Sequence, residues 1–296
     1  MKILITGAAG MLADAIIPVL LKNGKHEVIQ TDVNRRLPDI EALDVTDPAG
    51  VMGRISAVKP DFVFHLGAET DVDLCEQEPD RAYMVNTLGT ENIALACAQN
   101  NTGLLYISSG AVFGGEKRYP YTEFDTPRPV SVYGDSKLQG EYIVKGILTK
   151  YFIVRAGWMV GGWELDKKFV YKIVRQVREG KKHLKVVFDK AGSPTFTKDF
   201  AANLMSLIGT GRYGTYHLAN KGGCTRYDIA VKIVEYMGLS GEVSVEPITS
   251  AKFPLPAPRA CSEQIRNYKL DLLGINNMPK WEDSLREYIS ANKDKD

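Results

Sequence analysis

The N-terminal segment contains an apolar run, a glycine-rich turn and the start of a helix in direct succession. Lys2–Thr6 is typical of a buried parallel strand. It leads into Gly7-Ala-Ala-Gly10-Met-Leu-Ala13, after which apolar residues continue at helical spacing: Ala15, Ile16, Val19 and Leu20. The free backbone amides and the dipole of such a helix start face an anion, so the segment predicts a pyrophosphate cradle inside an α/β sheet.

The second predicted strand ends in a carboxylate. Val28–Thr31 is followed by Asp32, about 20 residues beyond the turn, where an acidic residue can bind a ribose 2′-hydroxyl and repel a 2′-phosphate. Arg35 and Arg36 come next and could either clamp a 2′-phosphate or be solvated loop charges. The segment predicts a dinucleotide cofactor, NAD or NADP, with NAD favoured.

Further apolar runs alternate with helical patterns. Strands are expected at Asp61–Leu66, Gly103–Ser109 and Phe152–Ala156, and residues 80–100 form an amphipathic pattern. Its inward face is predicted to carry Ala82, Val85, Leu88, Ile93, Ala94 and Cys97, with Asn86 on the polar face. This alternation predicts a Rossmann-like doubly wound parallel sheet, in which ligands bind beyond the carboxyl ends of the strands.

The later part of the chain has shorter and more mixed elements. We therefore expect a dinucleotide-binding Rossmann domain over residues 1–155, which the chain re-enters around residues 190–220. Residues 156–296 would form mainly a smaller C-terminal α/β lobe that binds the substrate over the edge of the sheet.

Tyr133-Gly-Asp-Ser-Lys137 places a phenol and an ammonium one helical turn apart, on the same face. A neighbouring cation stabilises phenolate, so Lys137 is expected to lower the pKa of Tyr133 towards working pH. Such a phenol can exchange a proton with a sugar or steroid hydroxyl. The pair alone is a weak signal, but it follows a strand ending in Ser108-Ser109 and the glycine turn.

Composition limits the classes of partner. The net charge of +1 gives no electrostatic reason to expect nucleic acid or an acidic membrane surface, and no apolar run has the length of a membrane span. A strand that begins at residue 2 leaves no room for a signal peptide. The widely spaced cysteines predict reduced thiols, no metal site and a cytoplasmic protein: Cys75, Cys97, Cys224 and Cys261.

Taken together, these motifs resemble the extended short-chain dehydrogenase/reductases, and most closely the dTDP-4-dehydrorhamnose reductase branch. The segments that carry the resemblance cover nearly the whole chain: Gly7–Leu12, Thr70–Glu76, Ser108–Gly114, Pro120–Glu123, Val132–Glu141, Arg155–Trp158, Gly192–Thr195 and Ala257–Arg259.

The resemblance implies roles for residues that bind the cofactor. The pyrophosphate would meet the glycine turn, Asp32 the adenosine ribose, and Asp44 with Val45 the adenine edge. The full set is Gly7, Gly10, Met11, Leu12, Asp32, Asp44, Val45, Leu66, Gly67, Ala68, Thr70, Tyr133 and Lys137.

The resemblance also implies the chemistry. Tyr133 would protonate the reduced carbonyl oxygen while hydride arrives from the nicotinamide, Lys137 would hold the nicotinamide ribose, and Ser109 would orient the substrate oxygen. Gly110 lies beside Ser109 in the expected substrate site. Trp158 could contact substrate or pack in the core, and Lys198 and Arg259 could clamp a diphosphate or be solvated.

One segment departs from the branch. The rhamnose reductases usually carry Ser-Thr-Asp-Tyr-Val-Phe where this chain has Ser108-Ser-Gly-Ala-Val-Phe113. Ser109 can replace the threonine hydroxyl, but Gly110 offers no carboxylate, so the resemblance leaves the accepted sugar open. The same gap argues against a 4,6-dehydratase.

We therefore expect an NAD(P)H-dependent reductase of a nucleotide-linked 4-keto-6-deoxy sugar. Two alternatives remain: a sugar-nucleotide 4-epimerase with the same tyrosine and lysine, and a non-catalytic NAD(P)-binding regulatory subunit, because a fold does not guarantee turnover. The nucleotide is open, and a homodimer is the common choice among soluble assemblies.

Overall fold

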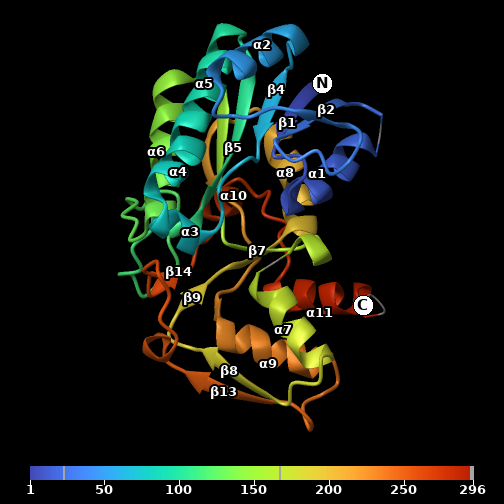
Figure 1. Cartoon of the computed structure of the whole chain (residues 1–296), viewed down its shortest axis with the longest axis vertical. Helices are drawn as coiled ribbons and strands as arrows, with labels where there is room; N and C mark the ends of the chain where they lie inside the picture. Colours follow the sequence, from blue (N-terminus) through green and yellow to red (C-terminus); the bar gives the residue numbers. More distant parts are fainter. Residues whose placement is uncertain (23, 167, 294–296) are drawn as a thin grey trace.

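A seven-stranded sheet, parallel throughout, runs through one half of the molecule (Figure 1). The structure is a computed structural model and describes residues 1–22, 24–166 and 168–293. In order across the sheet the strands are β11 (Gly214–His217), β6 (Tyr151–Ala156), β5 (Gly103–Ser109), β4 (Phe62–His65), β1 (Lys2–Thr6), β2 (Glu27–Asp32) and β3 (Ile40–Ala42). The direction of winding reverses between β1 and β4, which confirms the predicted doubly wound sheet.

Helices cover both faces of this sheet because its central strands are apolar on both sides. Ile3, Leu4 and Ile5 of β1 are fully buried, as expected for a strand between two helical layers. One layer contains α1 (Met11–Leu21) and α8 (Thr197–Gly209), and the other contains α2 (Pro48–Val58), α5 (Gly89–Gln99) and α6 (Val132–Ile147). Short helices α3 (Val72–Gln77) and α4 (Pro79–Tyr83) pack against α6, and α10 (Tyr268–Leu272) packs against β11.

A smaller lobe lies beyond the carboxyl edge of the sheet (Figure 1). It contains the strand pairs β7 (Trp158–Val160) with β10 (Pro194–Phe196), and β8 (His183–Val187) with β13 (Ser244–Ile248). A three-stranded sheet has the order β12 (Cys224–Thr225), β9 (Ala191–Gly192) and β14 (Ser262–Glu263). Helices α7 (Phe169–Arg178), α9 (Arg226–Tyr236) and α11 (Trp281–Ala291) enclose its separate apolar core.

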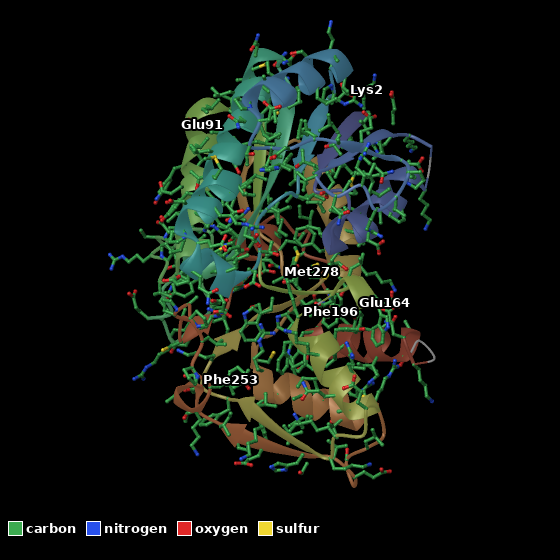
Figure 2. All side chains as sticks on the ribbon, in the orientation of Figure 1. Lys2, Glu91, Glu164, Phe196, Phe253 and Met278 are labelled. Atoms are coloured by element: carbon green, nitrogen blue, oxygen red, sulfur yellow. The ribbon has the colours of Figure 1, made fainter. Side chains whose placement is uncertain are left out.

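The chain passes between the two parts more than once. After β10 it enters α8, which packs on α1, and then β11, which pairs with β6 at the edge of the large sheet. Phe196 belongs to the core of the lobe and Met278 to the core of the sheet, and both lie at the level where the two parts meet (Figure 2). No helix in the described part of the chain combines the length and apolar character needed to cross a bilayer.

The helical stretch predicted over residues 80–100 contains a π-helical turn, Met84–Leu88, between α4 and α5. The wider turn inserts an extra residue and rotates the buried face. As a result, the predicted inward position of Leu88 is wrong, since its side chain is 43% exposed, and Asn86 is fully buried instead of lying on the polar face. The rotation turns Asn86 towards α6.

Helix α6 is fixed to the sheet by a buried ion pair. The Arg155 guanidinium of β6 donates to both carboxylate oxygens of Glu141 of α6, at 2.7 Å each, and the Ser108 hydroxyl donates to Glu141 at 2.7 Å. Burial acts to raise the pKa of Glu141, but the bonds from Arg155 outweigh it and hold the pKa below its ordinary value of 4.5.

We expect Arg155→Met to reduce the free energy of unfolding by about 3–5 kcal/mol, because it leaves the Glu141 carboxylate buried beside fewer donors. Urea denaturation measures the change. The double variant with Glu141→Gln should lose less than the sum of the single variants, since the two groups act on each other. Strict additivity would contradict a direct pairing.

The ion pair also predicts a pH dependence. Because the folded pKa of Glu141 is depressed, the pair stabilises the protein above pH 4.5 and this contribution is lost as the pH falls below that value. Glu141→Gln should lack this part of the acid sensitivity in the same denaturation measurements.

Candidate active site

The glycine turn lies where the sheet reverses direction. Gly7 has a φ of +73°, and a Cβ added there would lie 2.4 Å from the backbone nitrogen of Gly67 at the end of β4. Only glycine allows these two backbones to approach so closely. Gly10, Met11 and Leu12 follow at the start of α1, so the amides of the helix start face the crevice beyond β1 and β4.

Asp32 ends β2 beside this turn. Its carboxylate accepts hydrogen bonds from the backbone nitrogens of Ala9, at 2.9 Å, and Asn34, at 2.8 Å. The Arg36 guanidinium donates to the Ala9 carbonyl at 2.9 Å and lies 3.7 Å from Asp14, while Arg35 is exposed. The acidic group is thereby fixed at the edge of the turn.

The other predicted cofactor residues lie along the same strand ends. Leu66, Gly67 and Ala68 are half-buried after β4, and Thr70 is exposed at the end of that loop. Asp44 is exposed and accepts from the Thr46 backbone and hydroxyl, and Val45 is buried and accepts at its carbonyl from Asn92.

Ser109, Tyr133 and Lys137 come together at the carboxyl end of β5. Ser109 is the last residue of β5, and its hydroxyl accepts from the backbone nitrogen of Ala111 at 3.1 Å. Tyr133 and Lys137 lie in the first two turns of α6, which begins after the capping side chain of Ser131. The strand end and the helix start therefore present a hydroxyl, a phenol and an amine to one crevice.

The predicted pKa of Tyr133 is wrong in direction. Burial raises the pKa of the phenol to about 12, the Ser109 hydroxyl opposes the rise, and the negative charge of Glu263 adds to it. Helical spacing correctly places Lys137 one turn away, but the cost of a buried phenolate exceeds any stabilisation by the amine. The phenol is therefore neutral at working pH, as a proton donor should be.

The Lys137 amine is buried over an aromatic ring. It lies 4.3 Å from the centre of the Tyr106 ring, and no described residue accepts a hydrogen bond from it. Burial lowers the pKa of Lys137 to about 7, with Glu141 opposing the shift. Its donors are thus available to a ligand in the crevice.

A buried polar network behind the site was not foreseen. The Asn86 side chain accepts from the backbone nitrogen of Glu69 at 2.8 Å and donates to Ser136 of α6 at 3.0 Å. The His65 ring bonds Thr6 at 2.7 Å and Thr90 at 3.1 Å. This network fixes α6 and the loop after β4 to each other. The available signal was the polar Asn86, but α-helical periodicity assigned it to solvent.

The lobe contributes a second group of side chains. The Trp158 indole donates to the Glu263 carboxylate at 3.0 Å, and the Arg226 guanidinium lies 3.7 Å from the indole centre. Sequence reasoning found Trp158 but missed Glu263 and Arg226. They carry no motif, and only the pairing of β9 with β12 and β14 brings them together. Gly110 lies at the same place, since a Cβ there would be 3.2 Å from the Glu263 carbonyl oxygen.

The two predicted diphosphate clamps have different positions. Arg259 donates to Asp73 of α3 at 2.9 Å and to the Ala257 carbonyl at 2.8 Å, which joins the lobe to the sheet. Lys198 is 74% exposed and forms an ion pair with Glu287 of α11. The structure brings Arg259 near Glu263 but does not bring Lys198 to the other predicted residues. In the described residues no cluster of histidine, cysteine or acidic side chains could hold a metal.

We expect the stability of the protein to rise with pH above about 7 through Lys137. Between about 7 and 10.5 the unfolded chain holds a proton on this amine that the folded chain has released, which gives up to about 1.4 kcal/mol per pH unit. Lys137→Met should remove this slope in urea denaturation, whereas Lys150→Met, at an exposed site after α6, should keep it. An unchanged slope in Lys137→Met would contradict the buried amine.

Comparison with known proteins agrees with this geometry. A family model described as "RmlD substrate binding domain" matches residues 1–293. A protein of Mycolicibacterium smegmatis named dTDP-4-dehydrorhamnose reductase is 33% identical over 292 residues, covering 98% of this chain and 85% of the relative.

Solved structures are similar over the whole chain. The crystal structure of a protein described as a dTDP-4-dehydrorhamnose reductase from Clostridium acetobutylicum is 39% identical, with a TM-score of 0.91, and covers 99% of this chain and 100% of that one. A Bacillus anthracis protein of the same description, in complex with NADP, is 33% identical with a TM-score of 0.89, covering 98% and 99%. The chain therefore belongs to the RmlD substrate binding domain family, within the extended short-chain dehydrogenase/reductases.

Proposed function

We propose that this protein reduces the 4-keto group of a nucleotide-linked 4-keto-6-deoxy sugar, with a nicotinamide dinucleotide as the hydride donor. The observation that carries the proposal is a neutral, half-buried phenol, Tyr133, placed with Ser109 and Lys137 at the sheet edge that holds the glycine turn. The relatives named dTDP-4-dehydrorhamnose reductase support dTDP-4-dehydrorhamnose as the first substrate to test.

The residues present fit a bound dinucleotide. The contact of Gly7 with Gly67 leaves no side chain between the glycine turn and the end of β4, and the Lys137 amine has donors without described acceptors. When bound, the reduced dinucleotide supplies the hydride. The Ser109 hydroxyl holds the substrate carbonyl oxygen, the Tyr133 phenol donates its proton to that oxygen, and Lys137 orients the nicotinamide ribose.

The state of Tyr133 fits the proton-donor role that reduction requires, and the relatives at 33% and 39% identity are named reductases. An epimerase must first oxidise a sugar hydroxyl, for which Tyr133 would have to accept a proton as phenolate. With the pKa of Tyr133 raised to about 12, mainly by burial, the neutral donor form is the one present. A reductase needs that form at the start of each turnover.

We expect Tyr133→Phe to lower kcat by about 10²-fold or more, because the proton donor is removed while the ring remains. Oxidation of NADH with dTDP-4-dehydrorhamnose, followed by absorbance, measures turnover, and titration of NADH measures binding, which should be unchanged. Tyr142→Phe is the matched control, since Tyr142 lies on the same helix and is 51% exposed. Full activity of Tyr133→Phe would refute the mechanism.

We infer that NADH is the preferred coenzyme. Asp32 places a carboxylate at the edge of the turn, where it would repel a 2′-phosphate, and Arg36 is engaged with Ala9 and Asp14. The NADP bound by the Bacillus anthracis relative makes the preference a property to be measured for this chain.

For Asp32→Asn we expect kcat/KM with NADPH, relative to NADH, to rise about tenfold, equivalent to about 1.4 kcal/mol. The change removes the repelling charge but keeps an oxygen for the Ala9 amide. Asp39→Asn removes the same charge from an exposed position in the loop after β2 and should leave the ratio unchanged. A wild-type preference for NADPH would overturn the inference.

A further inference from the structure

Arg226 is a half-buried cation without a hydrogen-bond acceptor among the described residues. Its guanidinium stacks 3.7 Å from the centre of the Trp158 ring and 5.0 Å from that of Phe169. No described residue accepts a hydrogen bond from its side chain, although the charges of Glu263 and Asp166 act on it through space. Burial lowers the pKa of Arg226 to about 10, which still leaves it charged at neutral pH. Unpaired charged donors in a half-buried position are costly unless a ligand satisfies them.

Trp158 is held on both faces. A Cβ added to Gly192 of β9 would lie 2.3–2.7 Å from indole carbons, so the bare backbone of Gly192 lies against the ring. Arg226 is also in contact with the ring and cannot share that face, so it covers the opposite one. Because both faces are covered, the indole ring is held in place, and a ligand can contact it only at its edge.

Glu263 lies at the edge of the Trp158 ring that carries the indole nitrogen. One carboxylate oxygen accepts from the Trp158 nitrogen at 3.0 Å, and no described residue donates to the other oxygen. The Glu263 backbone touches Gly110, the residue after Ser109, and its charge acts on Tyr133. Glu263 is therefore close to the reacting end of the crevice.

The small sheet brings the two charged groups to the same ring. In β9, Gly192 is paired with Glu263 of β14 on one side and with Cys224 of β12 on the other, and Arg226 begins the helix that follows β12. Both groups therefore contact the Trp158 indole, Glu263 at its nitrogen and Arg226 over its ring. In Figure 1, β14 and β9 lie next to each other beyond α3, the short helix that follows the loop after β4.

We propose that Arg226 and Glu263 form the subsite that binds the diphosphate and the adjoining sugar of the substrate. Arg226 binds oxygens of the diphosphate, and the unpaired oxygen of Glu263 accepts a hydrogen bond from a ring hydroxyl of the sugar. The protein groups follow the order of the substrate groups. Ser109 and Tyr133 would meet the carbonyl, Glu263 the sugar ring and Arg226 the diphosphate. This assignment rests on the proposed function.

Two further cations lie near Glu263. The charges of Arg259 and Lys190 act on its carboxylate, and Arg259 is itself paired with Asp73. Lys190 donates to the Arg259 carbonyl at 2.8 Å, which fixes it beside the loop that leads into β14. A guanidinium stacked on an aromatic ring keeps its planar fork of donors oriented for phosphate oxygens.

The test is the binding of dTDP to the NADH-saturated protein, measured by calorimetry. Arg226→Met should raise the Kd for dTDP about 10- to 100-fold, as expected for lost hydrogen bonds to a charged group. The Kd for thymidine, which has no phosphate, should not change, nor should that for NADH. Arg226→Lys keeps the charge but not the fork and should give a smaller loss. Lys232→Met removes an exposed cation from the same helix and should have no effect.

Glu263→Gln tests the sugar contact separately. Because glutamine can still accept from Trp158 but no longer repels the diphosphate, the Kd for dTDP should not rise above that of the wild type. The additional affinity that the sugar gives dTDP-glucose over dTDP should fall about fivefold or more. If dTDP binds Arg226→Met as tightly as wild type, or if thymidine weakens equally, the subsite is refuted.

The same data separate the two proposals. Loss of dTDP affinity in Arg226→Met, without oxidation of NADH by any 4-keto sugar nucleotide in the wild type, would support the subsite and refute the proposed reaction. Oxidation of NADH with unchanged dTDP affinity in Arg226→Met would support the reaction and refute the subsite.

Discussion

The contact of the Gly7 backbone with the Gly67 backbone is the constraint on which the rest of the site depends. It occurs where the winding of the sheet reverses, between β1 and β4, and it requires a positive φ at Gly7 and no side chain there. Because the two strands approach so closely, the helix start after β1 and the loop after β4 border one crevice. The carboxyl ends of β2 and β5 then bring Asp32 and Ser109 to its two sides.

The chemistry of the crevice is set by burial as much as by the identity of its groups. The ion pair of Glu141 with Arg155 fixes α6 to strand β6 of the sheet. The phenol and amine that α6 carries are thereby held where water is excluded, and burial moves both towards their neutral forms. A neutral phenol suits protonation of a carbonyl oxygen, which links the packing of this helix to the direction of the proposed reaction.

Much of the sheet and of its edge could be predicted from the sequence. Long apolar runs and the glycine turn are local signals, so β1, β4 and β5 and the positions of Asp32, Tyr133 and Lys137 follow from spacing alone. The π-helical turn at Met84–Leu88 could not be predicted, because hydrophobic periodicity assumes a constant number of residues per turn. The roles of these residues in binding and catalysis remain predictions.

The sequence by itself determined the alternating strands and helices of the sheet, the glycine turn and the helical pairing of Tyr133 with Lys137, because each depends on residues close together in the chain. Only the tertiary structure decided the pKa of Tyr133, since that depends on how much water the folded chain excludes. It alone also decided the meeting of Arg226 with Glu263 across Trp158, because strands of two residues, β9, β12 and β14, carry no periodic signal and acquire neighbours only when the lobe folds.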